Sequence, residues 1–251
     1  MSRSKGALAL LLLSSFLSSS THAATTTLVD STGSLNKAST LPPTTFKEDG
    51  SSGVVALLTS PGTTGSFFPP VTTVIFDGSI LKAPGASLEE STGLARGIGA
   101  AAAGTLADAV VLGGVTMGDV EGGLAGTRHG RTLAELFSSV LQSKKSGTAS
   151  TLIVAVEEAS SGASSSSSTL DADSIKENIE EIFDGVAALV LGVNDEEELS
   201  GYFNVEVALV KSSEDVTKVM DQAAKAAATS TKSSSSVMGS KPFSTAFSEI
   251  Y

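Results

Sequence analysis

Apolar residues along the chain come in short runs that alternate with longer amphipathic segments. Five runs rich in β-branched residues predict strands at 53–59, 71–76, 109–112, 151–156 and 203–210. Between them, apolar residues recur at helical spacing in two sets: Leu133, Leu136, Phe137, Val140 and Leu141, and Ile175, Ile179, Ile182 and Phe183. Several of the short runs are apolar at every position, so these strands are expected to be buried on both faces.

Capping residues indicate where the helices begin. A Ser or Thr followed three residues later by Glu is the signature of a capping box. Three such pairs precede helical segments: Ser87 with Glu90, Thr132 with Glu135, and Ser174 with Glu177. The first predicts a helix that runs into the alanine-rich segment 99–107. A last helix is predicted from Ser213 onward.

Strands that alternate with helices predict an α/β fold. The expected architecture is a three-layer, doubly wound, mainly parallel sheet with helices on both faces. Ligands of such sheets bind beyond the carboxyl ends of the strands. The loops 59–70, 77–92, 113–131 and 157–173 are therefore the expected positions of any chemistry.

The first 23 residues have the layout of a secretory signal peptide. Arg3 and Lys5 precede an apolar run from Gly6 to Leu17, and small residues up to Ala23 suit a signal peptidase. We expect cleavage after Ala23 and a location in the endoplasmic reticulum lumen or outside the cell. Residues 24–52 read as a Ser/Thr-rich flexible leader, 53–228 as one domain, and 229–251 as a Ser/Thr-rich tail. No transmembrane segment is expected in the mature chain.

Charge and cysteine content narrow the classes of function. The chain has 16 basic and 27 acidic residues, a net charge of −11, and loss of Arg3 and Lys5 makes it −13. Such an acidic chain repels nucleic acid, so the expected partner is a protein. It has no cysteine, which excludes thiol nucleophiles, thiolate metal sites and disulfides. No Asn-x-Ser/Thr triplet is present, so no N-linked glycan is expected.

The loop after the first strand has the position of a phosphate-binding loop. Gly62, Gly65 and Ser66 could offer backbone amides and a hydroxyl to phosphate and Mg²⁺. The loop has no lysine, because none occurs between Lys47 and Lys82. The segment 67–70 is Phe-Phe-Pro-Pro, and prolines lack the amide hydrogens that a helix start would present to phosphate. A tight turn is the simpler interpretation.

Other polar residues could carry chemistry at the strand ends. Asp77 closes the second strand and could hold Mg²⁺, or serve a metal-dependent adhesion motif together with Gly78-Ser79, whose last position is Leu81. His129 would have to serve any Ser-His-Asp triad, but Gly-x-Ser-x-Gly is absent, so a solvated loop is the simpler expectation. The acidic pairs Glu157-Glu158 and residues 195–198 are most simply solvated charge.

One segment resembles a known family. Residues 199–215, LSGYFNVEVALVKSSED, resemble the end of the G domain in root-hair-defective-type large GTPases, relatives of atlastin in the dynamin superfamily. The order of other segments agrees: 53–58, 107–112, 151–158 and 174–186 resemble successive segments of the same domain. The resemblance covers about residues 53 to 225 and implies a P-loop-type G domain.

The departures from this family fall at its chemical positions. Gly65 or Ser66 stands where the family has the P-loop lysine, and Ile80 replaces the glycine that senses the γ-phosphate after Asp77. Glu157-Glu158 replaces the base-reading Arg-Asp, so Glu158 stands for the base-binding carboxylate. The stalk and paired membrane segments of the family have no counterpart here.

These departures predict a pseudo-GTPase, kept as a binding or scaffolding module without a cofactor. One alternative is a surviving GTPase that binds GTP with Mg²⁺ through Gly62, Gly65, Ser66, Asp77 and Glu158. Another alternative is a metal-dependent adhesion-type module centred on Asp77. Loss of the lysine and the switch glycine removes groups that stabilise charge and position water in phosphoryl transfer, so no hydrolysis is expected.

Overall fold

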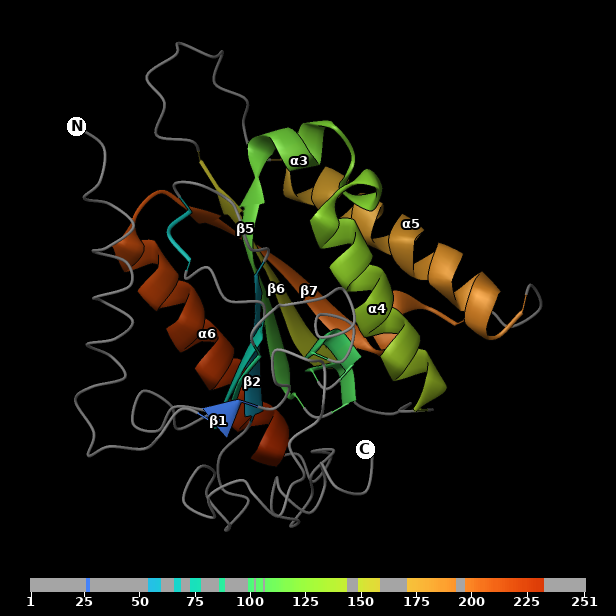
Figure 1. Cartoon of the computed structure of the whole chain (residues 1–251), viewed down its shortest axis with the longest axis horizontal. Coiled ribbons are helices and arrows are strands. Elements are labelled where there is room, and N and C mark those ends of the chain that lie inside the picture. Colours follow the sequence, from blue (N-terminus) through green and yellow to red (C-terminus); the bar gives the residue numbers. More distant parts are fainter. Residues whose placement is uncertain are drawn as a thin grey trace.

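The fold is built on one central sheet, seen in a computed structural model of the chain (Figure 1). The structure describes residues 26–27, 54–59, 66–68, 73–77, 86–88, 99–101, 103–105, 107–143, 149–158, 171–192 and 197–232. Within 26–27, 73–77, 86–88 and 230–232 only the backbone is described. The predicted signal peptide and residues Gly62, Gly65 and Ile80 lie outside the described residues.

Seven strands form the sheet in the order β1-β4-β3-β2-β5-β6-β7. They are β1 (Thr26–Thr27), β2 (Val54–Thr59), β3 (Thr73–Asp77), β4 (Ala86–Leu88), β5 (Ala109–Thr116), β6 (Ser150–Glu157) and β7 (Phe203–Val210). The four strands β2, β5, β6 and β7 are parallel to one another. The predicted α/β class with a mainly parallel sheet is therefore confirmed.

Helices cover both faces of the parallel strands and make three layers (Figure 1). One face carries the helical residues 99–101 and 103–105, α4 (Arg128–Gln142) and α5 (Ala172–Val190). The other face carries α6 (Ser213–Lys232). The short elements α3 (Met117–Glu121), η2 (Leu124–Gly126) and η3 (Leu199–Gly201) lie in the connections.

The handedness of the connections explains this distribution. The chain moves from β2 to β5, β6 and β7 always toward the same side of the sheet. Right-handed crossovers in one direction place every connecting helix on one face. Because α6 follows the last strand, it is free to return across the opposite face.

The strand predicted at 71–76 has a direction that sequence alone did not give. β3 is antiparallel to β2, with Val54 opposite Asp77. A parallel neighbour needs a crossover of a dozen or more residues, usually a helix. The connection 60–72 is barely that long and contains Pro69-Pro70. A connection of this length returns more easily to an antiparallel neighbour than it crosses over to a parallel one.

The predicted helix starts are wrong in three places. Ser87 lies in strand β4 rather than at a helix start. Thr132 lies inside α4, where its hydroxyl donates to the Arg128 carbonyl oxygen at 3.0 Å, and the cap is Thr127. The cap of α5 is Asp171, whose carboxylate accepts from the amides of the first turn, rather than Ser174. The start of α6 at Ser213 is confirmed.

Two expected boundaries also shift. Thr26–Thr27, within the predicted flexible leader, forms a two-residue strand parallel to β4. Helix α6 continues to Lys232, so the first residues of the predicted tail at 229–232 are helical. No helix in the described ranges has both the length and the apolar character needed to cross a membrane.

Two apolar clusters, one on each face of the sheet, hold the layers together. On the α4–α5 face, Phe137 meets Phe183 edge to face, with ring centroids 5.4 Å apart, and packs against Phe203. On the α6 face, Phe68 is only 3% exposed and packs with Val216, Val219 and Ala223. Burial of this kind stabilises each large side chain by about 1.5–3 kcal/mol, and no cysteine is present to add a cross-link.

Phe68 lies directly against the backbone of β5 at Gly113. A Cβ atom built on Gly113 would be 2.6 Å from Phe68 Cδ1, closer than carbon atoms approach. Glycine at this position therefore lets the ring cover the carboxyl end of β5. The contact anchors the segment 66–68 to the sheet.

We predict that Gly113→Ala lowers the free energy of unfolding by about 1–3 kcal/mol, because the added methyl group forces Phe68 out of its position. Urea unfolding followed by circular dichroism measures this change. Gly185→Ala is the matched control, since Gly185 is an exposed position of α5 with nothing within 4 Å of a built Cβ. It should raise stability by about 0.5–1 kcal/mol. An equal effect of both substitutions would contradict the packing of Phe68 on Gly113.

Candidate functional site

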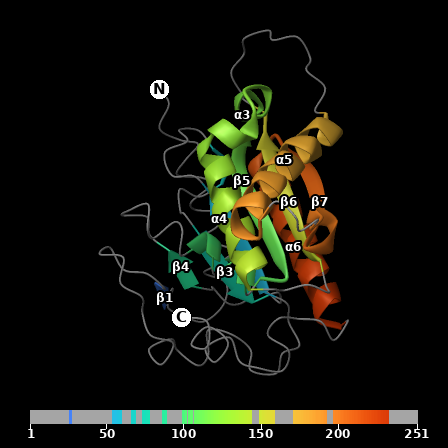
Figure 2. The same cartoon turned by 90° about the vertical axis from the view of Figure 1, so that its right-hand side faces the viewer.

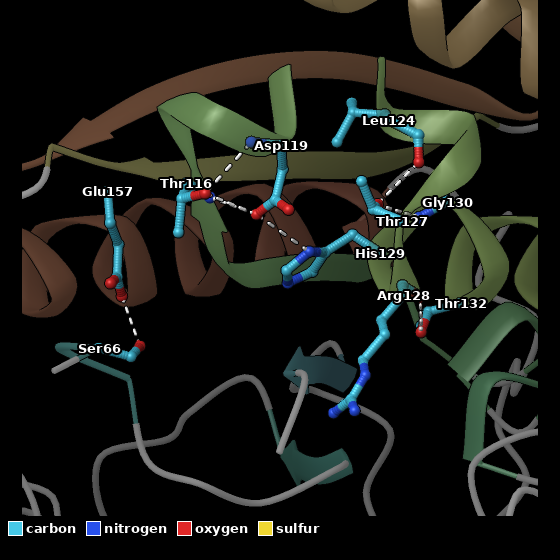
Figure 3. Close-up of polar contacts among 10 residues, drawn as sticks. All are labelled: Ser66, Thr116, Asp119, Leu124, Thr127, Arg128, His129, Gly130, Thr132 and Glu157. Carbon is cyan, nitrogen blue, oxygen red and sulfur yellow. Dashed lines mark hydrogen bonds and ion pairs between the residues drawn. The ribbon is translucent and has the colours of Figure 1, made fainter. Parts of the chain in front are cut away.

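Polar side chains gather at the carboxyl ends of the parallel strands (Figure 3). Ser66 follows β2, Thr116 ends β5, Asp119 lies in α3, and Glu157 ends β6. His129 reaches this edge from the first turn of α4. This is the region where the sequence predicts ligand binding.

Glu157 and Ser66 make the tightest polar contact at this edge. The Ser66 hydroxyl donates to Glu157 Oε1 at 2.6 Å, and the Phe67 amide donates to the same oxygen at 3.0 Å. Ser66 Oγ also accepts from the Phe68 amide at 3.1 Å. Both hydrogen-bonding roles of the Ser66 hydroxyl are thus taken by groups of the chain itself. The Glu157 carboxylate thus accepts hydrogen bonds from one hydroxyl and one amide of the candidate phosphate loop.

Glu157 is a buried acid, not the solvated charge that sequence predicts. Glu157 is only 6% exposed to solvent. Burial raises the pKa of the Glu157 carboxyl, and the hydrogen bonds from Ser66, Phe67 and Phe68 oppose that rise. The loop therefore supplies the donors that a buried carboxylate requires.

Glu158 points away from this contact. Its Oε2 lies 2.8 Å from Lys211 Nζ, with both side chains more than half exposed. Its amide donates to the Val210 carbonyl oxygen at 3.0 Å. An exposed pair of this kind contributes little to stability. Glu158 is thus a surface residue beside β7, and neither of the two glutamates is left as a free carboxylate over the loop.

Asp77 lies at the opposite end of the sheet from Ser66. Because β3 is antiparallel to β2, Asp77 pairs with Val54 at the start of β2, whereas Ser66 follows its end at Thr59. Five strand steps of about 3.3 Å separate the two ends, or about 17 Å. The structure therefore does not bring Asp77 and Ser66 together, as one Mg²⁺-nucleotide site would require.

His129 is buried, which corrects the expectation of a solvated loop. It is 4% exposed and lies on α4, whose cap Thr127 accepts from the Gly130 amide at 3.1 Å. A Cβ on Gly130 would lie 2.1 Å from the Leu124 carbonyl oxygen, so glycine permits η2 to pack against this turn. Among the described residues, neither ring nitrogen of His129 makes a hydrogen bond of good geometry, although the Gly113 backbone lies near the ring.

Asp119 is a charged group close to His129. Its Oδ2 lies 3.6 Å from His129 Nδ1, too far for a hydrogen bond. The same oxygen accepts from the amide and hydroxyl of Thr116, at 2.9 and 2.8 Å, in the capping box of α3. Burial lowers the pKa of His129, while Asp119 and the Gly113 backbone oppose this shift. His129 is thus a buried imidazole held mainly neutral, beside an acid that already caps a helix.

The two described residues of the remaining acidic cluster lie beside η3, at the start of β7 and away from this edge. Glu197 and Glu198 are exposed beside η3, and Glu198 accepts from the Ser200 hydroxyl at 3.1 Å. Asp195 and Glu196 lie outside the described residues. In the ranges that the structure describes, no three His, Asp or Glu side chains gather as a metal site would require.

Sequence reasoning missed two features of the site. The capping box of Thr116 and Asp119 matches the Ser/Thr-x-x-acid pattern, but it lies in the segment 113–131, which the sequence predicts to be a loop. The Ser66–Glu157 contact joins residues 91 positions apart, and no local pattern predicts such a contact.

A groove lies along the helix layer of the described residues. The groove, of about 700 Å³, runs between α4 and α5, and Val186, Leu189 and Val190 line one side of it. Leu189 is 87% exposed there. The groove is not at the carboxyl ends of the strands and includes none of the predicted site residues.

The chain matches no family model, and no curated protein is significantly similar to it.

We predict that His129 titrates below the ordinary histidine value, because burial disfavours its charged form. Proton NMR can follow this directly, since the chain has two histidines and the other is His22. Asp119→Asn should lower the pKa further, since the acid favours the imidazolium. A titration at or above the ordinary value would contradict the buried position.

The same shift predicts how stability depends on pH. A histidine whose pKa is lower in the fold makes the unfolded chain bind more protons, so its contribution is lost as pH falls below about 6.5 toward the folded pKa. The slope is at most about 1.4 kcal/mol per pH unit. Urea unfolding of the wild type and of His129→Gln isolates this term, because the slope should flatten in the variant.

Proposed function

We propose that the chain is a nucleotide-free binding or scaffolding module of the secretory pathway, a pseudo-GTPase related to the root-hair-defective/atlastin type. The observation that carries the proposal is the buried contact of Glu157 with Ser66 and Phe67. A protein partner, not a cofactor, is the proposed ligand.

The Glu157 contact supports this proposal because the Glu157 carboxylate already accepts hydrogen bonds from the Ser66 hydroxyl and the Phe67 amide. A phosphate would need the same hydroxyl and amide donors that the carboxylate already accepts from. A buried carboxylate next to a phosphate also repels it, since both are anions. If a phosphate displaced Glu157, the carboxylate would lose its hydrogen-bond donors, and this loss costs further free energy.

The placement of Phe68 and Asp77 supports the same conclusion. Phe68 fills the space over Gly113, where β5 reaches the carboxyl edge. Asp77 stands at the other end of the sheet, so it is not positioned to hold a metal ion beside Ser66. With no P-loop lysine, a nucleotide lacks at least two charge-assisted bonds of about 1.5–3 kcal/mol each. That loss weakens binding by roughly 10² to 10⁴-fold.

We predict that titration of the wild type with GTP and Mg²⁺ in a calorimeter gives no binding at micromolar concentrations, and that hydrolysis does not exceed background. Glu157→Gln, which removes the charge and keeps the shape, tests whether repulsion alone suppresses binding. We expect no micromolar site in this variant either, because the lysine is still missing.

Ser66→Ala and Asp77→Ala define the contrary outcomes. Micromolar, Mg²⁺-dependent GTP binding that Ser66→Ala removes would overturn the pseudo-GTPase proposal and favour a surviving GTPase. A rise in melting temperature with Ca²⁺ or Mg²⁺ that Asp77→Ala removes would favour the metal-dependent adhesion alternative instead.

A further inference from the structure

Strand β7 forms one edge of the sheet (Figure 2). It is eight residues long, Phe203–Val210, and its one neighbour in the strand order is β6. It contains neither Pro nor Lys, the residues that commonly protect such edges. A long strand at an edge can template the pairing of another strand.

The pairing with β6 determines which backbone groups face outward. The Ser150 amide donates to the Tyr202 carbonyl oxygen at 2.9 Å, and the Glu158 amide donates to that of Val210 at 3.0 Å. In a parallel pair, the residues that bond to the neighbour alternate. Residues 204, 206 and 208 therefore face β6, and the N–H and C=O groups of 203, 205, 207 and 209 face away from it.

These outward groups form an open ladder. Within the described part of the chain, no hydrogen bond reaches the outer side of β7 from a backbone or a side chain. As far as the described residues extend, the amides and carbonyls of Val205, Val207 and Leu209 are open to strand pairing.

The two sides of the edge differ in chemistry. On the α5 side, Val205 and Val207 are half-buried against the core. On the α6 side, Asn204 is exposed, and the half-buried Glu206 accepts from Asn204 Nδ2 at 3.5 Å and from Gln222 Nε2. Both donors are neutral amides, so in the described residues the charge of Glu206 has no cationic partner.

We propose that β7 is the docking edge of this module, and that it binds an extended partner segment in which apolar residues alternate with Lys or Arg. The apolar side chains would cover Val205 and Val207, and a cation would lie opposite Glu206. The net charge of −11 favours a basic partner on approach. This inference rests on the proposed binding function and names the chemistry of the partner.

A second copy of the chain fits the edge less well. In a two-fold antiparallel pairing of two β7 strands, Glu206 of one copy would lie at or near Glu206 of the other. Like charges opposite one another across a strand pair are destabilising. The overall negative charge of each copy adds to that repulsion.

Amide hydrogen exchange tests the inference without changing the protein. The probe is a peptide of about ten residues in which Val alternates with Lys, and a Val/Glu peptide is the control. We expect the Val/Lys peptide to protect the outward amides of Val205, Val207 and Leu209. The amides of residues 204, 206 and 208 should change little, since they already bond to β6.

Three variants test the same contact by fluorescence anisotropy of the labelled peptide. Val207→Pro removes an outward amide and no β6 bond, so binding should fall by about tenfold or more. Val207→Ala keeps the amide, so binding should stay within about threefold. Glu206→Gln should weaken binding roughly two- to fivefold, the size of a cross-strand charge pair. Melting curves check that each variant folds. If Val207→Pro does not fold, the hydrogen-exchange experiment on the wild type still tests the inference.

Several results would overturn the inference. They are no binding of the Val/Lys peptide, equal binding of the Val/Glu peptide, or protection that does not alternate along β7. A dimer in sedimentation that Val207→Pro dissociates would assign the edge to a second copy instead. If the peptide does not bind and GTP does not bind either, only the inference about the β7 edge is overturned. If GTP binds, the proposed function is overturned whatever the peptide does.

Discussion

Three parallel strands, β2, β5 and β6, are apolar on both faces and must be covered on both faces, and the rest of the fold follows from that constraint. Strands β2, β5 and β6 bury nearly every side chain. Because the chain adds them in one direction, right-handed connections place α4 and α5 on one face. The other face needs its own cover, which α6 and Phe68 provide. A chain without cysteine depends on this apolar burial for its stability.

The segment that brings Phe68 to the sheet also determines the chemistry of the carboxyl edge. Phe68 can pack on Gly113 only if residues 66 and 67 pass close to the end of β6, and there Glu157 accepts from both. The apolar contact and the buried hydrogen bonds therefore support one another. Together they hold residues 66–68, which belong to the loop where a phosphate site was predicted, against the core. Under the proposed function, binding takes place elsewhere on the molecule, at the edge of β7.

The strands were predictable because runs of β-branched residues at 109–112 and 151–156 admit few alternatives to a buried strand. The helix starts were not, because a Ser or Thr with Glu three residues later occurs by chance, as at Thr132, whose hydroxyl bonds within its own helix. The direction of β3 depends on the length and prolines of the preceding connection, not on its own pattern. The burial of Glu157 and His129 depends on residues far away in sequence, and so charge alone suggested solvated surface for Glu157.

A crystal structure determined with excess GTP and Mg²⁺ tests the central claim most directly. The account predicts that Glu157 stays hydrogen-bonded to the Ser66 hydroxyl and the Phe67 amide, with no nucleotide beside them. A phosphate bound by these two donors, with the Glu157 carboxylate rotated away, would contradict it.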